Sequence, residues 1–268
     1  MRTDLVSDDL WKRVAPLLSP APERRHRFPG RLRVPDRAAL AGVLYVLRTG
    51  VAWRDVPAQT VGCSGVTAWR RLRDWTEASV WPRLHAALLA ELRHADLLDL
   101  DDCAVDGTRP GTQRGDHVGP SPVDRARPGS KHHLIVDRHG TPLAVTLTGG
   151  NRHDVTQLLP LLDAVPSIRG LRGRPRRKPR RLYADRGYDF DKYRRLLWKR
   201  GIKPLIARRG VVHGSGLGKV RWVVERAFAW LHQFKRLRIR YERRADLHQG
   251  LLELACSLIC LRRLRTTR

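Results

Sequence analysis

The hydrophobic pattern of this chain changes near residue 98, and that change limits the folds that the chain can adopt. Before it, apolar residues recur at helical spacing. After it, short runs of strand-forming residues alternate with longer segments of helical period. This order predicts an all-α domain over residues 1–98 and an α/β domain over residues 99–268, built on a mixed sheet with helices on both faces.

Capping residues predict where the helices of the first region begin and end. Ser7, Asp36 and Ser64 can each start a helix, because short polar side chains accept hydrogen bonds from the first free backbone N–H groups. Gly50, just beyond Arg48, can end the second helix in the left-handed conformation.

The helix that starts after Ser64 is predicted to have two unlike faces. Its inward stripe comprises Val66, Trp69, Leu72, Arg73, Trp75 and Thr76, and its outward row comprises Thr67, Arg70, Arg71 and Asp74. A helix, a short turn and a helix with exposed arginines resemble a helix-turn-helix DNA reader, so Thr67, Arg70 and Arg71 are candidate DNA contacts. A solvated arginine face on a small helical bundle would explain the same residues.

The second region is predicted to contain five strands and four helices. The strands cover residues 103–107, 132–137, 142–148, 180–185 and 203–207. The helices cover residues 154–165, 190–201, 219–237 and 245–264. Residues 107–130, rich in Gly, Pro and Arg, are predicted to be a long loop that becomes ordered on binding. Residues 169–181 form a basic loop with eight Lys and Arg residues.

The charge of the chain points to a polyanionic partner. There are 53 Lys and Arg against 26 Asp and Glu, a net charge of +27, and nucleic acid is the leading candidate. The longest apolar runs, residues 38–47 and 251–261, are too short to span a bilayer, and the N-terminus lacks a secretion signal. We therefore expect a soluble, cytoplasmic, nucleoid-associated protein without a membrane partner. The four cysteines fit neither a disulfide framework nor a zinc site and are expected to be buried.

Two aspartates lie where strands of the second region end. Phosphoryl transfer on DNA without a covalent nucleophile commonly uses two divalent ions, which carboxylates hold roughly 3.5 to 4 Å apart. Asp106 ends the first predicted strand, and Asp185 ends a later one, where mixed α/β sheets place their ligands. Asp189 and Asp191 follow closely, but we assign them to the next helix, as its N-cap and in its first turn.

A third acid, Glu225, lies within the apolar helix of residues 219–237, which we expect to be buried on most sides. Arg221 and His232 share its face. A buried carboxylate is costly without a cation, and a metal ion is one such cation. An ordinary intrahelical salt bridge between Glu225 and Arg221 is the alternative.

Other conspicuous polar and aromatic residues receive no catalytic role. His132 and His133 are neighbours on a strand, so they face opposite sides of the sheet. Asp154 is predicted to be an N-cap. Trp198, Trp222 and Trp230 are expected in the core.

Several long segments together resemble the bacterial DDE transposases of the insertion-sequence-five family. They are DGT at Asp106, the stretch GPSPVDRARPGSKHHLIVDRHGTPLAVTLTGGNRHD, RLYADRGYD at Asp185, and GKVRWVVERAFAWLHQFKRLRIRYERR at Glu225. FPGRLRVPDRAALAGVLYVLRTGVAWRDVP and GCSGVTAWRRLRDW also look like the family's helical DNA-binding region. The resemblance implies a ribonuclease-H-like (retroviral-integrase-like) mixed-sheet core, preceded by an all-α, helix-turn-helix-like domain.

The resemblance also implies the roles of individual residues. Asp106, Asp185 and Glu225 would be the catalytic triad that binds Mg²⁺ or Mn²⁺, as two ions. Arg221 and Glu225 match the family's R-x3-E signature. The family often places Lys or Arg seven residues after the glutamate, where this chain has His232. His232, Lys235 and Arg236 are therefore candidate DNA contacts along with Arg221, and Arg176, Arg177 and Lys178 of the basic loop are expected on the DNA backbone.

The implied activity is metal-dependent strand cleavage at the ends of an insertion sequence, followed by attack of the freed 3′-hydroxyl on target DNA. The partners would be double-stranded DNA, as terminal inverted repeats and as target, and further copies of the chain, as a dimer or higher oligomer on DNA. The main alternative is a catalytically inactive, transposase-derived DNA-binding protein. A plain nuclease of the same fold and a basic RNA-binding structural protein are further alternatives.

Overall fold

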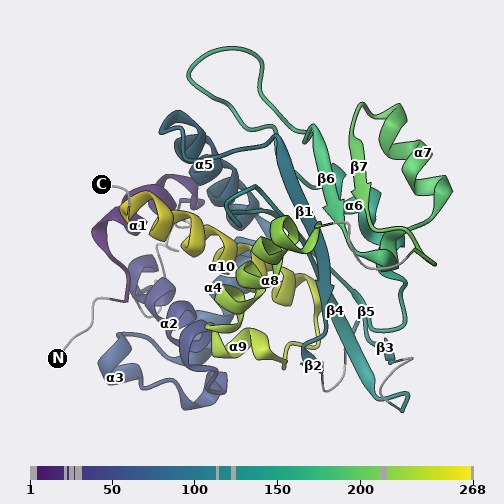
Figure 1. The fold of residues 1–268 in the computed structure, drawn as a ribbon. Coiled ribbons are helices and arrows are strands. Elements are labelled where there is room, and N and C mark those ends of the chain that lie inside the picture. Colours follow the sequence, from purple (N-terminus) through teal and green to yellow (C-terminus); the bar gives the residue numbers. More distant parts are fainter. Residues whose placement is uncertain are drawn as a thin grey trace.

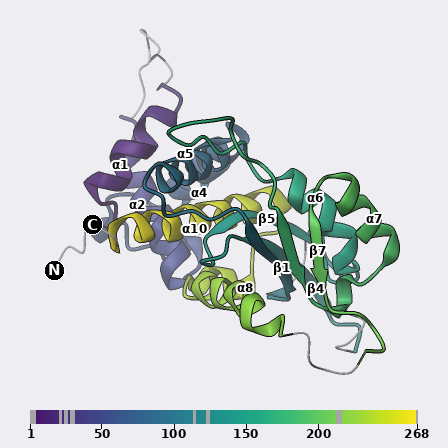
Figure 2. The same ribbon diagram turned by 45° about the horizontal axis from the view of Figure 1, so that its top comes forward.

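A twisted mixed sheet stands between two helical layers in the computed structural model of the chain (Figure 1). The structure describes residues 5–20, 23, 27, 32–112, 115–121, 125–211 and 216–266. The N-terminal helices and the long helix α10 (Ala245–Thr266) lie on one side of the sheet. The short helices α6 (Leu158–Asp163) and α7 (Asp191–Lys199) lie on the other, as the turned view in Figure 2 also shows.

Ser7 and Ser64 cap their helices as predicted, whereas Asp36 is the first residue of its helix and Pro35 holds the cap position without a side-chain cap. The elements are α1 (Asp8–Val14), η1 (Ala15–Leu17), α2 (Asp36–Thr49), η2 (Trp53–Asp55), α3 (Ala58–Val61), α4 (Gly65–Glu77) and α5 (Val80–His94). Ser7 Oγ accepts from Leu10 N, Ser64 Oγ accepts from Thr67 N, and Gly50 ends α2 with a φ of 77°. The inward stripe of α4 is corrected in part: Val66 is exposed, and the buried face consists of Gly65, Ala68, Leu72 and Trp75. Val66 lies on the outward face because it is four residues before the exposed Arg70, one helical turn away.

Five strands form the main part of the sheet, in the order β5-β4-β1-β6-β7. Their bounds are Asp102–Thr108 for β1, Pro128–Val136 for β4, Pro142–Gly149 for β5, Arg181–Ala184 for β6 and Lys203–Ile206 for β7. β4 runs antiparallel to both β1 and β5, whereas β6 and β7 continue from β1 as parallel strands. This order and these directions confirm the ribonuclease-H-like mixed-sheet class.

Residues 107–130 contain regular structure rather than a single long loop. β2 (Gly111–Thr112) and β3 (Gly119–Pro120) both pair with the start of β4, and β2 also pairs with β8 (Ile239–Arg240). The backbone therefore gains hydrogen bonds within the protein, which the composition of the segment does not reveal. The remainder of the loop prediction, at residues 113–114 and 122–124, falls outside the described residues.

The remaining elements connect the sheet to its helical layers. They are η3 (Asp154–Gln157), η4 (Arg186–Tyr188), α8 (Gly218–His232) and α9 (Lys235–Arg238). α10 packs against α5, α4 and β5, so one apolar core runs from the N-terminal helices into the sheet. The division at residues 98 and 99 stays a prediction. The four cysteines are free and buried, as expected.

A buried ion pair joins the N-terminal helices to the C-terminal part of the chain. Arg236 donates to Glu242 Oε1 through Nε at 2.9 Å and Nη2 at 2.6 Å, and the two side chains are only 6% and 2% exposed. Arg236 also donates to the carbonyl of Val51 at 3.1 Å and lies over the ring of Trp53. This side chain therefore fixes the turn after α2 against α9.

Replacing Arg236 with Met should lower the free energy of unfolding by about 3–5 kcal/mol, because it leaves the carboxylate of Glu242 buried without its main cation. The double variant Arg236→Met/Glu242→Leu should recover most of that loss. Urea unfolding followed by circular dichroism measures both. Arg54→Met is the control, because the ion pair of Arg54 with Asp55 is largely exposed. A loss for Arg236→Met as small as that of the control would contradict this account.

His85 joins α5 to the sheet and should make stability depend on pH. Its Nε2 is 2.9 Å from the carbonyl of Pro142, and burial lowers the pKa of His85 to about 4. As the pH falls below the ordinary histidine value of about 6.5, the unfolded chain takes up a proton that the folded chain does not, so the free energy of unfolding falls. The stability advantage of the wild type over His85→Gln should therefore shrink between about pH 7 and pH 4.5. An advantage that stays constant over this range in urea titrations would show that His85 does not titrate in this way.

Candidate active site

The parallel pairing of β1 with β6 brings two of the predicted catalytic aspartates together. Asp102 pairs with Arg181, Cys103 with Leu182 and Ala104 with Tyr183. Extended by two residues, this register sets Asp106 beside Asp185 at the carboxyl ends of adjacent strands, and the charge of Asp185 accordingly acts on the pKa of Asp106. Neighbouring strands are about 4.8 Å apart, which is short enough for both carboxylates to serve one site.

Helix α8 brings Glu225 to the same place, and Arg221 connects it to Asp106. Arg221 Nη1 is 2.8 Å from Asp106 Oδ2, and its Nη2 is 3.2 Å from Glu225 Oε1. The intrahelical salt bridge considered as the alternative for Glu225 thus exists, but the same guanidinium also bridges to the sheet. The expectation of a helix buried on most sides is wrong, because only one face of α8 packs on the sheet and the Glu225 side chain is 61% exposed.

The side chain of Asp106 is 21% exposed, which makes it far more buried than that of Glu225. The pKa of Asp106 is raised to about 6, mainly by burial; the charges of Asp185 and Glu225 act in the same direction, and the Gly107 N–H and Arg221 act against it. Because burial is the main cause of this rise, a further cation beside Asp106 would stabilise its ionised form.

The donor set suits a hard divalent cation. All three acids offer carboxylate oxygens, which Mg²⁺ and Mn²⁺ prefer, and their mutual repulsion would be relieved by such an ion. Within the described ranges, no group of three or more His, Cys, Asp or Glu side chains already forms a set that could hold a metal ion. Arg221 lies between Asp106 and Glu225, so its guanidinium would have to share these oxygens with the ion.

The three aspartates of residues 182–194 have separate tasks. Asp185 Oδ1 accepts from Gly187 N at 2.8 Å and so shapes the turn after β6. Asp189 is not the N-cap of α7, because Phe190 holds that position without a side-chain cap. Asp189 instead accepts from Arg194 Nε and from Arg209 N, each at 2.8 Å. Asp191 lies in the first turn of α7, as predicted.

A buried polar group that sequence reasoning missed lies next to the acids. Tyr188 is 2% exposed, and its hydroxyl has no hydrogen-bond partner among the described residues. Burial and the charges of Asp154, Asp106 and Asp185 raise the pKa of Tyr188. The only sequence signal for a role of Tyr188 beside the acids is its position three residues after Asp185, and that position fits an ordinary core tyrosine equally well.

Lys131, His133 and Asp154 form a second polar group near Gly107. Lys131 Nζ is 2.9 Å from Asp154 Oδ1, and His133 Nδ1 is 3.7 Å from the same oxygen. Asp154 is therefore not an N-cap; it is the first residue of η3, and the cap position belongs to His153. His132 and His133 face opposite sides of the sheet, as predicted, because His132 Nε2 instead lies 2.9 Å from His248 Nε2.

The candidate DNA contacts on the helices differ in how available they are. On α4, Arg70 is exposed, Thr67 is half-buried, and Arg71 pairs with Asp36 at 3.0 Å. Lys235 is exposed, whereas Arg236 faces the protein interior. Burial and nearby Arg238 lower the pKa of His232, so its half-buried ring is neutral at neutral pH.

In the basic loop, two of the three candidates are engaged within the protein. Arg176 donates to Asp101 Oδ1 at 2.7 Å, and Arg177 Nε donates to the carbonyl of Val165 at 3.0 Å. Lys178 is exposed.

Over the part of the chain that the structure describes, no helix has the length and apolar character needed to cross a membrane.

Solved structures of Mos1 transposase complexes share a weak likeness with this one. The Mos1 strand transfer complex aligns with 12% sequence identity and a TM-score of 0.32, over 87% of this chain and 78% of that one. A TM-score this low supports no argument, so the fold class rests on the order and direction of the strands.

Comparison with known sequences identifies the family. Residues 96–260 match the family model "Transposase DDE domain", and residues 6–85 match "Putative transposase of IS4/5 family". A putative transposase for insertion sequence element IS402 from Burkholderia cepacia is 66% identical over 148 residues, which cover 55% of this chain and 70% of that protein. An uncharacterized 16.2 kDa protein of insertion element IS402 from the same species is 55% identical over 109 residues, which cover 40% of this chain and 74% of that protein. With the mixed sheet and the acids at its strand ends, these matches show that the chain belongs to the DDE transposases of insertion sequences, in the IS4/5 family.

Proposed function

We propose that this transposase cuts a DNA strand at each end of its insertion sequence and joins the freed 3′-hydroxyl to target DNA, with Asp106, Asp185 and Glu225 as its catalytic residues. The observation that carries the assignment is the convergence of these acids at β1, β6 and α8, with Arg221 joining Asp106 to Glu225. The substrates would be the terminal inverted repeats of the element and the target duplex. Because two ends must be joined in one event, we also propose a dimer or higher oligomer on DNA.

DDE transposases use divalent metal ions, and we propose Mg²⁺ or Mn²⁺, as two ions, held by Asp106, Asp185 and Glu225. Such ions would polarise the scissile phosphodiester and lower the pKa of the attacking water or hydroxyl. The chain's own residues orient the reaction. Gly107 N–H and Arg221 hold the two oxygens of Asp106, and Gly187 N–H holds Asp185. Carboxylates fixed in this way need little rearrangement when the substrate arrives.

The remaining candidates supply DNA affinity in this proposal. Thr67, Arg70 and Arg71 on α4 would lie toward the terminal repeat, and Arg176, Arg177, Lys178 and Lys235 toward the phosphate backbone. Arg221 and His232 flank Glu225 on α8, but a neutral His232 offers phosphate only a hydrogen bond. Arg236 is left out, since its guanidinium is buried against Glu242. The net charge of +27 also leads us to propose association with the nucleoid.

Asp185→Ala should abolish cleavage and joining of a labelled duplex that carries the element's end, with a rate loss of at least about 10³-fold in Mg²⁺ or Mn²⁺. Asp191→Ala is the matched control, because it removes an aspartate of the same segment that only pairs with Arg208 on the surface. Its rate should stay within about twofold of wild type, as expected for an exposed ion pair. Binding to the element's end should survive in both variants, as measured by fluorescence anisotropy.

Three results would contradict the proposed cleavage and joining activity or its catalytic residues. Activity retained in Asp185→Ala would exclude Asp185 as a metal ligand. Cleavage without joining in the wild type would favour a plain nuclease. Binding without cleavage in the wild type, at any concentration of Mg²⁺ or Mn²⁺, would favour the inactive, DNA-binding alternative.

A further inference from the structure

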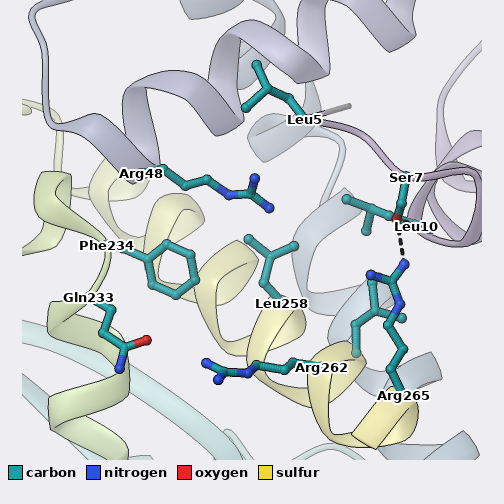
Figure 3. A pocket seen from close by; sticks show the side chains of 10 residues that line it. Leu5, Ser7, Leu10, Arg48, Gln233, Phe234, Leu258, Arg262 and Arg265 are labelled. Carbon is teal, nitrogen blue, oxygen red and sulfur yellow. Dashed lines mark hydrogen bonds between the residues drawn. The ribbon is translucent and has the colours of Figure 1, made fainter. Parts of the chain in front are cut away.

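Two hollows along α8 and α10 form one continuous groove outside the candidate active site. Their volumes are ≈ 410 Å³ and ≈ 470 Å³, and they share the lining residues Gln233, Phe234, Leu258 and Arg262. The first hollow lies between the N-terminal helices and α10, and Figure 3 shows Arg48 reaching toward it from α2 and Arg262 from α10. Neither lining includes Asp106, Asp185 or Glu225, so the groove is separate from the three acids.

The lining of this groove carries positive charge only. Arg48, Arg226, Arg262, Arg263 and Arg265 line it, and none of the described lining residues is Asp or Glu. Arg265 is already paired, with Asp9 and Ser7. Arg48 and Arg262 have no side-chain hydrogen bond or ion pair with any described residue. Burial lowers the pKa of Arg48, which indicates a cation partly removed from water without a compensating anion.

Aromatic rings on α8 continue from the groove toward the acids: Trp230 and Arg226 line the second hollow, and Trp222 lies just beyond its lining. The guanidinium of Arg226 lies 4.3 Å from the ring centroid of Trp222 and 4.8 Å from that of Trp230, so it is stacked between them. Arg226 Nη2 donates to the carbonyl of His139, which holds the stack in place. Trp222 is 47% exposed, against the expectation that it lies in the core. This stack begins on the helical turn that carries Glu225.

We propose that this groove binds an unpaired stretch of DNA strand next to the candidate active site, with bases against its rings and phosphates against its arginines. The proposal rests on the proposed function, because strand cleavage at an element's end leaves a free strand terminus that can separate from its complement. Single strands are bound by alternating cations and aromatic rings, since every base has a face that can stack. A duplex keeps those faces covered and would use only the arginines. The apolar floor at Trp230, Phe234 and Leu258 therefore favours the single strand.

The test measures binding of the full-length protein to two fluorescein-labelled probes, an oligothymidine of about 12 nucleotides and a duplex of the same length. EDTA is present throughout, so the outcome does not depend on catalysis. Trp222→Ala should weaken binding of the single strand about tenfold, the value of one stacked base, and should change duplex binding less than about twofold. Arg48→Gln/Arg262→Gln should reduce the slope of log affinity against log salt for the single strand by about 1.4, for two lost phosphate contacts.

Two variants on α7 are the matched controls. Trp198 is 57% exposed, so it too lies outside the core where it was expected. Two neighbouring arginines, Arg194 and Arg208, are already paired with Asp189 and Asp191. Trp198→Ala and Arg195→Gln therefore remove the same kinds of side chain from another surface, and both should bind the single strand as the wild type does. Thermal unfolding of each variant checks that the fold is intact.

Two outcomes would overturn the proposal. Single-strand affinity that is unchanged in both groove variants would show that the groove is not a DNA site. Equal losses for the single strand and the duplex would make it a site for the duplex backbone instead. If the wild type binds in EDTA as proposed but fails to cleave in Mg²⁺ or Mn²⁺, the groove stands and only the proposed catalytic function fails.

Discussion

The neutralisation of closely spaced carboxylates by Arg221 is the interaction on which the site depends. The parallel register of β1 and β6 places Asp106 beside Asp185, and burial makes this negative charge costly, as the raised pKa of Asp106 shows. Arg221 offsets part of the cost while it ties α8 to the sheet. The protein thereby holds mutually repelling carboxylates close together, in an arrangement that an additional cation would stabilise.

The position of α8 depends in turn on the packing between the sheet and the N-terminal helices. α10 is buried along most of its length between α5 and β5, and α8 and α9 connect the acids to the turn after α2. Two buried polar contacts, from Arg236 to Glu242 and from His85 to Pro142, also hold this arrangement. The exposed face of α4 is consequently held at a fixed position relative to the three acids. DNA bound to α4 would therefore reach the acids at a defined distance.

Features that depend on nearby residues could be predicted from the sequence, and those set by distant residues could not. The cap at Ser64 and the place of Asp185 at a strand end follow from local pattern and are present. The position of Asp189 predicts an N-cap, but its carboxylate instead accepts a hydrogen bond from the backbone N–H of Arg209, twenty positions away in the chain. The exposure of Glu225 was missed because an apolar helix does not reveal which of its faces meets the sheet. The roles proposed for the three acids rest on family resemblance and geometry together.

Anomalous diffraction from crystals of the full-length protein soaked in Mn²⁺ would test the central claim most directly, because manganese scattering locates the ion without relying on activity. The account predicts a peak coordinated by Asp106 and Asp185, with Glu225 close by and the guanidinium of Arg221 displaced from at least one carboxylate. Calorimetric binding in solution should weaken with Asp185→Ala in parallel. A manganese peak bound by other residues, with Arg221 still joining Asp106 to Glu225, would contradict it.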